Sequence, residues 1–390
     1  MKYDLENGTL KIYFENRVDS SNASQIGDEA EAIRAANEHE SFILDIDDLQ
    51  YISSAGLRVL LKLRKEEKEM KIVNASPEVY EIFEMTGFSE MMTVEKAFRK
   101  LSVEGCDVIG QGAKGVVYRL DKETIVKVYK DPNSLPAIKR ERELARKAFV
   151  LGIPTAIPYD VVRVGESYGS VFELLSADSY STLIAKNPEK MEEYITVYAD
   201  LLRQIHNTEV KPEDMPDIKV LVSKWQYTVE PALDEADAAK LHKLIADTPD
   251  TMNMLHCDYH TNNIMMQNGE TLLIDMDTLS HGHPIFELAN VYITYVGFGE
   301  RDPKIVEKFI GLPYDTAKKI WKVFLPLYLQ TDDEEKIKEV EDKVKLLSYV
   351  RLMRHVLRRE GADSEEGKAT VELCRKNIKE LLGKIDTLTF

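Results

Sequence analysis

The first hundred residues alternate short segments that have the pattern of strands with short segments that have the pattern of helices. Leu10, Ile12 and Phe14 are separated by polar neighbours, which is the period of a strand with one buried face. Apolar residues recur at helical spacing in the segment 22–36, and the compact apolar run 42–46 predicts a further strand. Alternation of this kind predicts a small α/β domain in which helices pack on a mixed sheet.

From residue 108 the pattern becomes strand, glycine-containing loop, strand. Gly110, Gly112 and Gly115 form a GxGxxG pattern, and the run 116–120 that follows them is typical of a strand. A dinucleotide-binding fingerprint would instead open a helix. Strand, glycine loop and strand is the arrangement of kinases, in which the hairpin covers a nucleoside triphosphate. The residues expected to contact the nucleotide here are Gly110, Gln111, Gly112, Ala113, Lys114, Gly115 and Val117.

The next strand-like run, 124–129, carries a lysine among apolar residues. A lysine in such a position is costly unless a partner neutralises its charge. In the kinase arrangement the partners of Lys127 are the ATP phosphates and a glutamate of the following helix, which the pattern places at 139–150. Glu141 is the first choice for this glutamate, and Glu143 is the alternative.

A second hairpin is predicted from the segments 161–164 and 168–174. In a kinase the chain that leaves such a hairpin forms the hinge between two lobes, and its backbone groups hold adenine. The order of elements places this hinge at 172–175. We therefore expect the backbone near Glu173 and Leu175 to bind the adenine ring.

The segment 256–263, HCDYHTNN, fits the pattern HxDxxxxN. This pattern is part of the catalytic loop of kinases, where the aspartate receives a proton from the attacking hydroxyl group. Asp258 is the candidate for that role, and His256 is expected to orient the loop. Asn263 supplies the amide that completes the pattern.

An Asn-Gly pair at 268–269, between two apolar runs, predicts a tight β-hairpin. Pairing the two residues that flank this turn places Asn263 opposite Ile274. Asn263 and Asp275 then emerge together at the open end of the hairpin. One amide oxygen and one carboxylate are ligands suited to Mg²⁺, which completes its coordination with phosphates and water. Asp277 is a candidate for a further metal contact.

Composition sets limits on partners and location. A chain of 390 residues is expected to hold two or three domains. The formal net charge of −17 argues against a nucleic-acid surface and is compatible with a cationic substrate, although excess acid also simply keeps a protein soluble. The scattered cysteines Cys106, Cys257 and Cys374 form neither a disulfide framework nor a CxxC site. No apolar run is long enough to cross a bilayer. We expect a cytoplasmic protein without membrane or nucleic-acid partners.

The segment 44–61, LDIDDLQYISSAGLRVLL, followed by KIVNASPEVYEIFEMTGF, resembles the STAS family of anti-sigma-factor antagonists. The likeness covers about residues 1–101. It implies that Ser54, at the start of the central helix, accepts a phosphate and controls binding of a regulatory protein partner. A phosphate there would meet free backbone N–H groups. Ser53 stands where the family has Asp, and Ala55 where it often has Ser or Thr. The alternative is that Ser54 only caps the helix.

The span from about residue 105 to 390 resembles the aminoglycoside phosphotransferase/choline kinase family. LLRQIH at 201–206 matches the helix before the catalytic region of that family, and IDMD at 274–277 replaces the DFG of protein kinases. No arginine follows His256, and no Ala-Pro-Glu occurs downstream, which favours a small-molecule acceptor over a protein acceptor. After Pro284 the pattern is mostly helical, as that family's C-terminal lobe requires.

These observations predict an α/β STAS-like domain at 1–102 and an α+β bilobal kinase-like domain. The kinase-like part would have a β-rich N-lobe at 103–176 and a helical C-lobe with the acceptor pocket at 177–390. The leading hypothesis is an ATP- and Mg²⁺-dependent phosphotransferase that acts on the hydroxyl group of a small molecule such as an aminoglycoside, choline or an amino sugar. The STAS-like domain would modulate this activity. The alternatives are a kinase that acts on its own or another STAS domain, and a regulatory module that only senses nucleotide.

Overall fold

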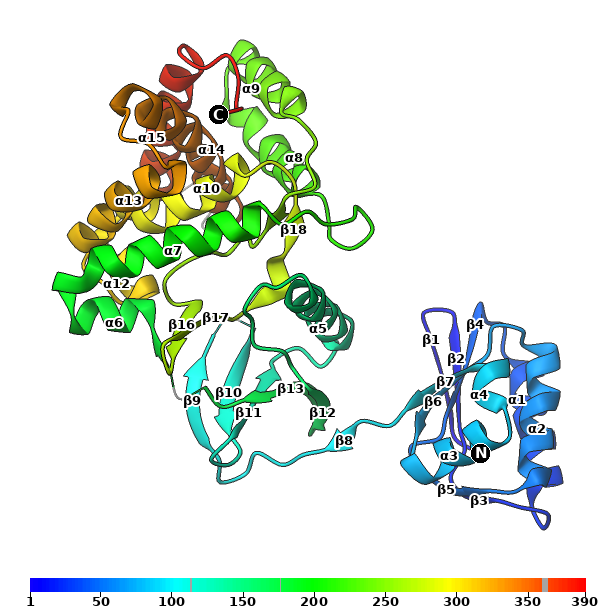
Figure 1. The fold of residues 1–390 in the computed structure, drawn as a ribbon. Coiled ribbons are helices and arrows are strands. Elements are labelled where there is room, and N and C mark those ends of the chain that lie inside the picture. Colours follow the sequence, from blue (N-terminus) through cyan, green and yellow to red (C-terminus); the bar gives the residue numbers. More distant parts are fainter. Residues whose placement is uncertain (113, 176, 360–363) are drawn as a thin grey trace. The chain divides into compact units, whose positions relative to one another are not determined.

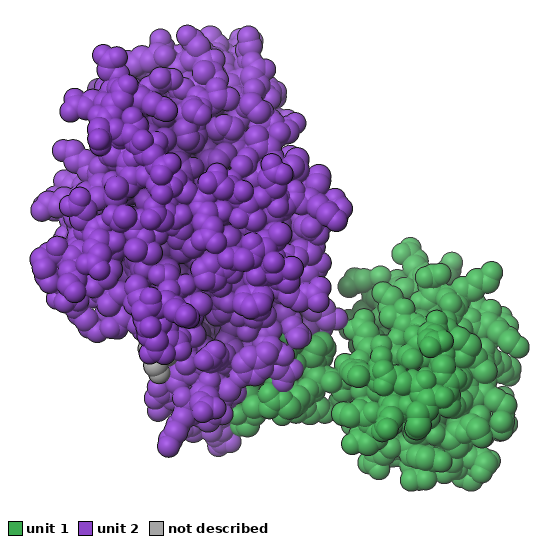
Figure 2. Space-filling model, in the orientation of Figure 1, with its two compact units in different colours: residues 1–102, 161–166 green, residues 103–160, 167–390 purple. Residues whose placement is uncertain are grey.

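The computed structural model describes residues 1–112, 114–175, 177–359 and 364–390. The chain divides into two compact units (Figure 2). The first comprises residues 1–102 with 161–166, and the second comprises 103–160 with 167–390. No helix within the described ranges is both long enough and apolar enough to cross a membrane.

The first unit is built on a five-stranded mixed sheet (Figure 1). β1 pairs with β2 antiparallel, and the other neighbours are parallel. In spatial order the strands are β1 (Tyr3–Glu6), β2 (Thr9–Tyr13), β4 (Ser41–Asp45), β6 (Lys71–Ala75) and β7 (Thr93–Lys96). A separate pair consists of β3 (Asn16–Val18) and β5 (Leu49–Ile52).

Four helices pack with these strands around one apolar core. They are α1 (Ala23–Ala36), α2 (Ser54–Glu66), α3 (Pro77–Met85) and α4 (Phe88–Met91). Leu10, Ile12 and Phe14 are almost fully buried, so the period-two pattern correctly identified the inner face of β2 and the residue after it. The α/β domain predicted from the alternating pattern is confirmed.

Ser54 does not cap helix α2, which was the alternative considered for it from the sequence. The Oγ atom of Ser53 accepts hydrogen bonds from the backbone N–H groups of Ala55 and Gly56, at 3.2 and 3.4 Å. Ser53 is therefore the N-cap of the helix, because its hydroxyl satisfies the free donors of the first turn. Ser54 is the first helical residue, and it is exposed.

A six-stranded sheet carries the glycine-containing hairpin. Its strands, in spatial order, are β8 (Arg99–Lys100), β12 (Asp160–Val164), β13 (Ser167–Glu173), β11 (Thr124–Tyr129), β10 (Gly115–Arg119) and β9 (Asp107–Gln111). Helix α5 (Leu135–Val150) contacts β13. This sheet, together with helix α5, forms the β-rich lobe that the sequence predicts.

The rest of the second unit is mainly helical, as predicted. Two small sheets flank the segment 256–263: β14 (Asp178–Ser179) with β16 (Ile264–Gln267) and β17 (Glu270–Leu273), and β15 (Met254–Leu255) with β18 (Ser280–His281). The helices are α6 (Tyr180–Lys186), α7 (Met191–His206), α8 (Ile218–Val229), α9 (Glu235–Asp247), α10 (Ile285–Tyr292), the π-helix Ile293–Gly297, α11 (Phe298–Arg301), α12 (Pro303–Ile310), α13 (Tyr314–Leu329), α14 (Glu334–Arg359) and α15 (Glu365–Leu382). Their apolar faces meet in one core.

One glycine of the loop is required by packing alone. A Cβ atom at Gly115 would lie 2.5 Å from the carbonyl oxygen of Val128 and 3.2 Å from its carbonyl carbon, whereas one at Gly112 would meet no described atom within 4 Å. The atoms near Gly115 belong to the backbone of the paired strand β11 and cannot move aside without disturbing the sheet.

We expect Gly115→Ala to lower the free energy of unfolding of the second unit by about 1–3 kcal/mol, because the added methyl group overpacks a strand pair. The matched variant Gly112→Ala should change it by less than about 0.5 kcal/mol. Urea unfolding followed by tryptophan fluorescence measures both, since Trp225 and Trp321 lie in this unit. Equal losses in the two variants would contradict the packing argument.

Candidate active site

A cavity of about 560 Å³ lies between the glycine-containing hairpin and the β16–β17 hairpin. Its apolar wall is formed by Ile109, Val117, Ile125, Ala156, Phe172, Met265 and Ile274. Its charged and polar wall is formed by Lys114, Lys127, Glu141, Asp258, Asn263 and Asp275. The cavity thus offers both apolar and charged lining, which suits a ligand with an apolar part and an ionic part.

Lys127 joins two carboxylates on separate elements. Its Nζ atom lies 3.2 Å from Oε1 of Glu141, on α5, and 3.2 Å from Oδ1 of Asp275, after β17. Burial disfavours the charged ammonium group, but the two carboxylates outweigh this and raise the pKa of Lys127 above its ordinary value. The side chain therefore stays cationic inside the cavity.

Glu141 is the glutamate that meets this lysine. It is buried, and its second oxygen accepts a hydrogen bond of 2.6 Å from the hydroxyl group of Tyr129. Burial and the charge of Glu141 raise the pKa of Tyr129, so that the phenol remains a donor. Glu143 points to the surface instead, where it pairs with Lys147 at 3.0 Å. Of the two glutamates that the sequence left open, only Glu141 contacts Lys127.

Asp258 lies on the loop before β16, next to Asn263. The amide nitrogen of Asn263 donates to the backbone carbonyl of Asp258 at 2.9 Å and lies 3.5 Å from its carboxylate. His260 is 3.6 Å from the other carboxylate oxygen. Burial raises the pKa of Asp258, but the neighbouring side chains of His260, His256 and Arg351 outweigh that effect and lower it to about 2. Asp258 is therefore a carboxylate throughout the neutral range.

A buried carboxylate of α10 holds this loop in place. Glu287 has no exposed surface. Its oxygens accept hydrogen bonds from the backbone N–H groups of His256 at 2.8 Å and Cys257 at 2.6 Å, and from the side chain of His206 at 2.8 Å. Cys257 has φ of +66°, a left-handed conformation that a side chain rarely adopts. The hydrogen bonds to Glu287 fix the conformation of this turn. They thereby help to orient the next residue, Asp258.

The hairpin after the loop has the register that the sequence predicts. Gln267 pairs with Glu270, and the N–H group of Ile274 donates to the carbonyl of Asn263 at 3.0 Å. The turn residues Asn268 and Gly269 both have positive φ, as a tight hairpin of this type requires. Asn263 and Asp275, the residue after Ile274, consequently lie beside each other, and both line the cavity.

The glycine loop approaches the other side of the cavity. Gln111 pairs with Val116, and the N–H group of Gly112 donates to the carbonyl of Gly115 at 2.9 Å. The side chain of Lys114 forms an ion pair with Asp277. Asp277, a candidate metal ligand, thus binds the lysine of the loop and does not line the cavity. Ala113, also expected to contact the nucleotide, lies outside the described residues.

The segment after β13 borders the apolar wall. The N–H group of Leu174 donates to the carbonyl of Glu123 at 2.6 Å, so this residue faces strand β11. Because backbone groups alternate in direction along an extended chain, those of Glu173 and Leu175 face the opposite side. Both residues line the cavity.

The donor atoms fit a magnesium ion. The amide nitrogen of Asn263 is engaged by Asp258, which leaves its amide oxygen for a ligand. Together with the carboxylate of Asp275, this gives an oxygen-only donor set, the kind that Mg²⁺ takes when phosphates and water fill its other positions. Within the ranges that the structure describes, no three His, Cys, Asp or Glu residues gather as a metal site of their own. The polar wall therefore fits a cation that arrives with a phosphate ligand.

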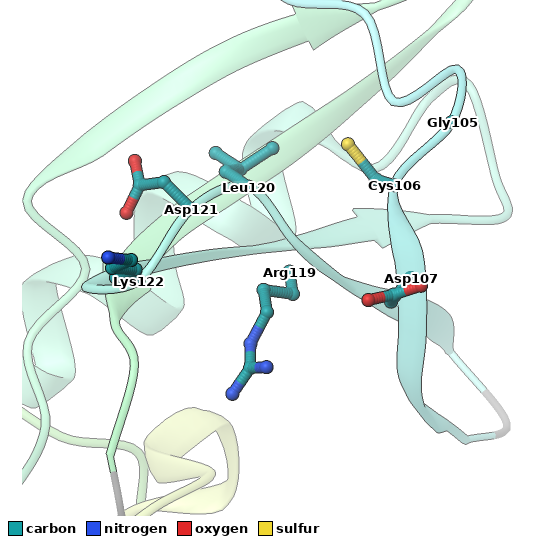
Figure 3. Close-up of a pocket in the computed structure, with 7 residues that line it drawn as sticks. All are labelled: Gly105, Cys106, Asp107, Arg119, Leu120, Asp121 and Lys122. Carbon is teal, nitrogen blue, oxygen red and sulfur yellow. The ribbon is translucent and has the colours of Figure 1, made fainter.

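A second hollow, of about 430 Å³, lies at the opposite end of the β9–β10 hairpin (Figure 3). Residues 105–107 and 119–122 line it. None of the predicted site residues belongs to it.

The phosphotransferase enzyme family model matches residues 106–312, and the STAS domain model matches residues 2–101. The chain belongs to the phosphotransferase enzyme family, with a STAS domain at its N-terminus. The STAS domain is 38% identical over 96 residues to BtrV of Bordetella bronchiseptica (strain ATCC BAA-588 / NCTC 13252 / RB50), which is named as an anti-sigma factor antagonist. That match covers 23% of this chain and 81% of BtrV.

The phosphotransferase is also similar to solved aminoglycoside phosphotransferases. ADP-bound APH(2'')-Ib has a TM-score of 0.46 and 14% identity over 71% of this chain and 91% of that chain. APH(4)-Ia, a thermostable mutant in a ternary complex with AMP-PNP and hygromycin B, has a TM-score of 0.49 and 12% identity over 70% of this chain and 93% of that chain. The ternary complex of streptomycin, ATP and APH(2")-IIa has a TM-score of 0.48 and 14% identity over 71% and 93%.

Three residues that support this site were not found from the sequence. Tyr129, His206 and Glu287 are separated along the chain, and each acts through a contact that only the fold creates. The available signals were a glutamate inside the apolar run 285–293 and the histidine that ends LLRQIH. A glutamate within an apolar run needs hydrogen-bond partners when it is buried, and this requirement was the signal that could have pointed to Glu287.

Glu287→Gln tests the role of the buried carboxylate in the phosphotransferase. The amide that replaces one oxygen cannot accept a hydrogen bond, so at least one of three buried donors loses its partner. We expect the free energy of unfolding to fall by about 1–3 kcal/mol. Glu307→Gln, at an exposed position of α12, should change it by less than about 0.5 kcal/mol. Urea denaturation compares the two, and similar values would show that Glu287 does not hold the loop.

Proposed function

We propose that this phosphotransferase moves the γ-phosphoryl group of ATP to a hydroxyl group of a small molecule. The observation that carries the proposal is that one cavity is lined by Lys127, which pairs with Glu141 and Asp275, and also by Asp258 and Asn263. An enzyme that transfers phosphoryl groups needs to hold phosphates, a divalent cation and an acceptor in one place. Each of these tasks has a candidate side chain in the cavity.

The apolar wall would hold the adenine ring, and the charged wall would hold the phosphates. Backbone groups of Glu173 and Leu175, two residues that line the cavity, would bond to the edge of adenine. Gly110, Gly112 and Gly115 keep the hairpin free of side chains where it approaches the phosphates. Lys127 would exchange part of its contact with Asp275 for the phosphate oxygens, while Glu141 keeps the ammonium group in position.

Asn263 and Asp275 would hold Mg²⁺ through their side-chain oxygens. The ion, when bound, neutralises phosphate charge that develops during transfer. Asp277 remains a proposed further contact, which would require it to release Lys114. The number of protein ligands is small, as expected for Mg²⁺ that is shared with a nucleotide.

Asp258 would orient the acceptor and take its proton. In the transfer the acceptor oxygen forms a bond to the γ-phosphorus, and the bond from that phosphorus to the β–γ bridging oxygen breaks. ADP leaves with the electron pair, and the hydroxyl proton passes to Asp258. With a pKa of about 2, this carboxylate is a weak base. It therefore suits a reaction in which the proton leaves late and the main task is positioning.

Two variants separate nucleotide binding from transfer. We expect Asp258→Asn to keep the affinity for MgATP and to lower turnover by about 10²–10⁴-fold, because the proton acceptor is lost. Lys127→Met should weaken nucleotide binding itself. Calorimetry with the non-hydrolysable MgAMP-PNP gives the affinities, and ADP release across aminoglycosides, choline, amino sugars, sugars and sugar acids gives turnover. Asp247→Asn and Lys243→Met, at exposed positions, are the controls.

Absence of nucleotide binding by the wild-type chain would overturn the proposal. Nucleotide binding with turnover that is unchanged in Asp258→Asn would leave a nucleotide-sensing module as the better description. An activity that requires Asp258 but accepts only protein would favour the kinase alternative.

The STAS domain is proposed to regulate the enzyme through Ser54 and a protein partner. Because Ser53 caps α2, the hydroxyl group of Ser54 is not needed for capping and lies exposed in the first turn. A phosphate on this hydroxyl would lie near the free N–H groups and the positive end of the helix dipole. The same position is the candidate acceptor if the kinase-like part phosphorylates protein.

Intact mass after incubation with MgATP tests this second candidate function. If the chain phosphorylates its own STAS domain, the wild type gains the mass of one phosphate, and Ser54→Ala and Asp258→Asn do not. Ser53→Ala serves as the neighbour control, since it removes a cap but leaves the acceptor. A gain in Ser54→Ala equal to that of the wild type would rule out Ser54 as the acceptor.

A further inference from the structure

Arg351, on α14, carries a positive charge that acts on the carboxylate of Asp258. Two hydrogen bonds connect α14, through α10, to the loop that carries Asp258. Asn290, on α10, donates to the carbonyl of Cys257, the residue before Asp258, at 3.2 Å. The neighbouring carbonyl of Ala289 accepts a hydrogen bond of 2.9 Å from Ser348, on α14. Arg351 follows Ser348 by three residues and so lies on the same face of the helix.

The guanidinium group of Arg351 rests on an aromatic ring. Its Cζ atom lies 5.2 Å from the ring centroid of Trp225, on α8. A guanidinium that stacks in this way keeps its N–H groups free along its edge. The side chain is partly buried, and Trp225 is almost completely buried. The ring of Trp225 therefore supports a charged group whose N–H donors have no carboxylate or carbonyl partner among the described residues.

No carboxylate or carbonyl in the described ranges forms an ion pair or hydrogen bond with Arg351. Burial lowers the pKa of Arg351, and the charge of Asp258 is the strongest influence against that effect. Arg354, one turn later, adds a second positive charge nearby. A partly buried cation with unused donors is costly unless a ligand pairs with it. The whole chain carries a net charge of −17, but Arg351 places a positive charge near Asp258.

We propose that the acceptor carries an anionic group, a carboxylate or a phosphate, which Arg351 binds while the acceptor's hydroxyl group faces Asp258. Arginine is suited to this role, because its planar fork makes two parallel hydrogen bonds to either anion. A cationic acceptor, which the overall charge suggested, would meet repulsion at this position. The inference deepens the proposed function and rests on it.

A simpler role for Arg351 is to keep Asp258 ionised. Its charge is one of several that lower the pKa of Asp258, after His260 and His256. If this were its only role, Arg351→Met would raise that pKa. The acidic limb of the pH–rate profile would then move to higher pH equally for every acceptor, and no anion would bind at Arg351.

The decisive experiment measures anion binding directly. In a Trp321→Phe background, Trp225 is the sole tryptophan, since the sequence has two. The protein is first saturated with MgADP to occupy the nucleotide site. Inorganic phosphate and acetate are then titrated while Trp225 fluorescence is recorded. We expect a saturable change that disappears in Arg351→Met and persists in Arg358→Met, an exposed position of the same helix.

Turnover supplies the second arm. Among acceptors that the enzyme phosphorylates, those with a carboxylate or phosphate should lose about tenfold or more in kcat/KM in Arg351→Met, as expected for loss of about 1.4 kcal/mol of binding. Arg351→Lys should recover part of the loss, and KM for ATP should not change. Comparing acids with phosphates, such as glucuronate with glucose 6-phosphate, distinguishes the two anions.

The inference is overturned if neither anion gives a saturable signal, or if the signal survives in Arg351→Met. It is also overturned if only cationic acceptors are phosphorylated. These outcomes leave the proposed function intact as long as MgAMP-PNP binds and turnover depends on Asp258. If the protein does not bind nucleotide, the proposed function itself is wrong, whatever the anion titration shows.

Discussion

The site depends on one buried positive charge. The ammonium group of Lys127 lies between Glu141 of α5 and Asp275, which follows β17, at equal distances of 3.2 Å. A buried lysine is tolerated only where acids pair with it, so the chain has to bring helix, sheet and hairpin to the same point. Tyr129 adds a hydrogen bond that orients Glu141. The cavity is therefore defined by the pairing of this charge as well as by apolar packing.

A second buried charge organises the opposite wall. Glu287 satisfies two backbone N–H groups of the loop that carries Asp258, and it also bonds to the ring of His206, so it joins α10 and α7 to that loop. His206 in turn lies 2.6 Å from the hydroxyl group of Tyr328, on α13. The loop conformation is strained at Cys257, and such strain persists only where the surroundings determine it. Asp258 thereby receives its orientation from the helical lobe, while Lys127 receives its own from the sheet.

Short sequence patterns correctly predicted those features that depend on neighbouring residues alone. The Asn-Gly turn determined the register of β16 and β17, and the register alone placed Asn263 beside Asp275. The choice between Glu141 and Glu143 was not accessible in this way, because both belong to one helix and only the packing of α5 shows which face turns inward. The capping of α2 was missed for a similar reason. Either of two adjacent serines could have capped the helix. Ser53 is the cap because its backbone is extended and its side chain accepts the hydrogen bonds of the first turn. Glu287 and His206 are 81 residues apart, so no spacing rule connects them.

Net charge is a poor guide to the acceptor because the active site responds to nearby groups. A charge on an exposed surface is screened within about 10 Å at moderate ionic strength, whereas a partly buried one is screened much less. Most acidic residues of this chain are exposed and so contribute little at Asp258. Arg351 sits at the catalytic loop, stacked on Trp225 and without an acid bound to it among the described residues. Recognition of the acceptor should therefore follow the individual charges near Asp258, Arg351 among them, rather than the net charge of the chain.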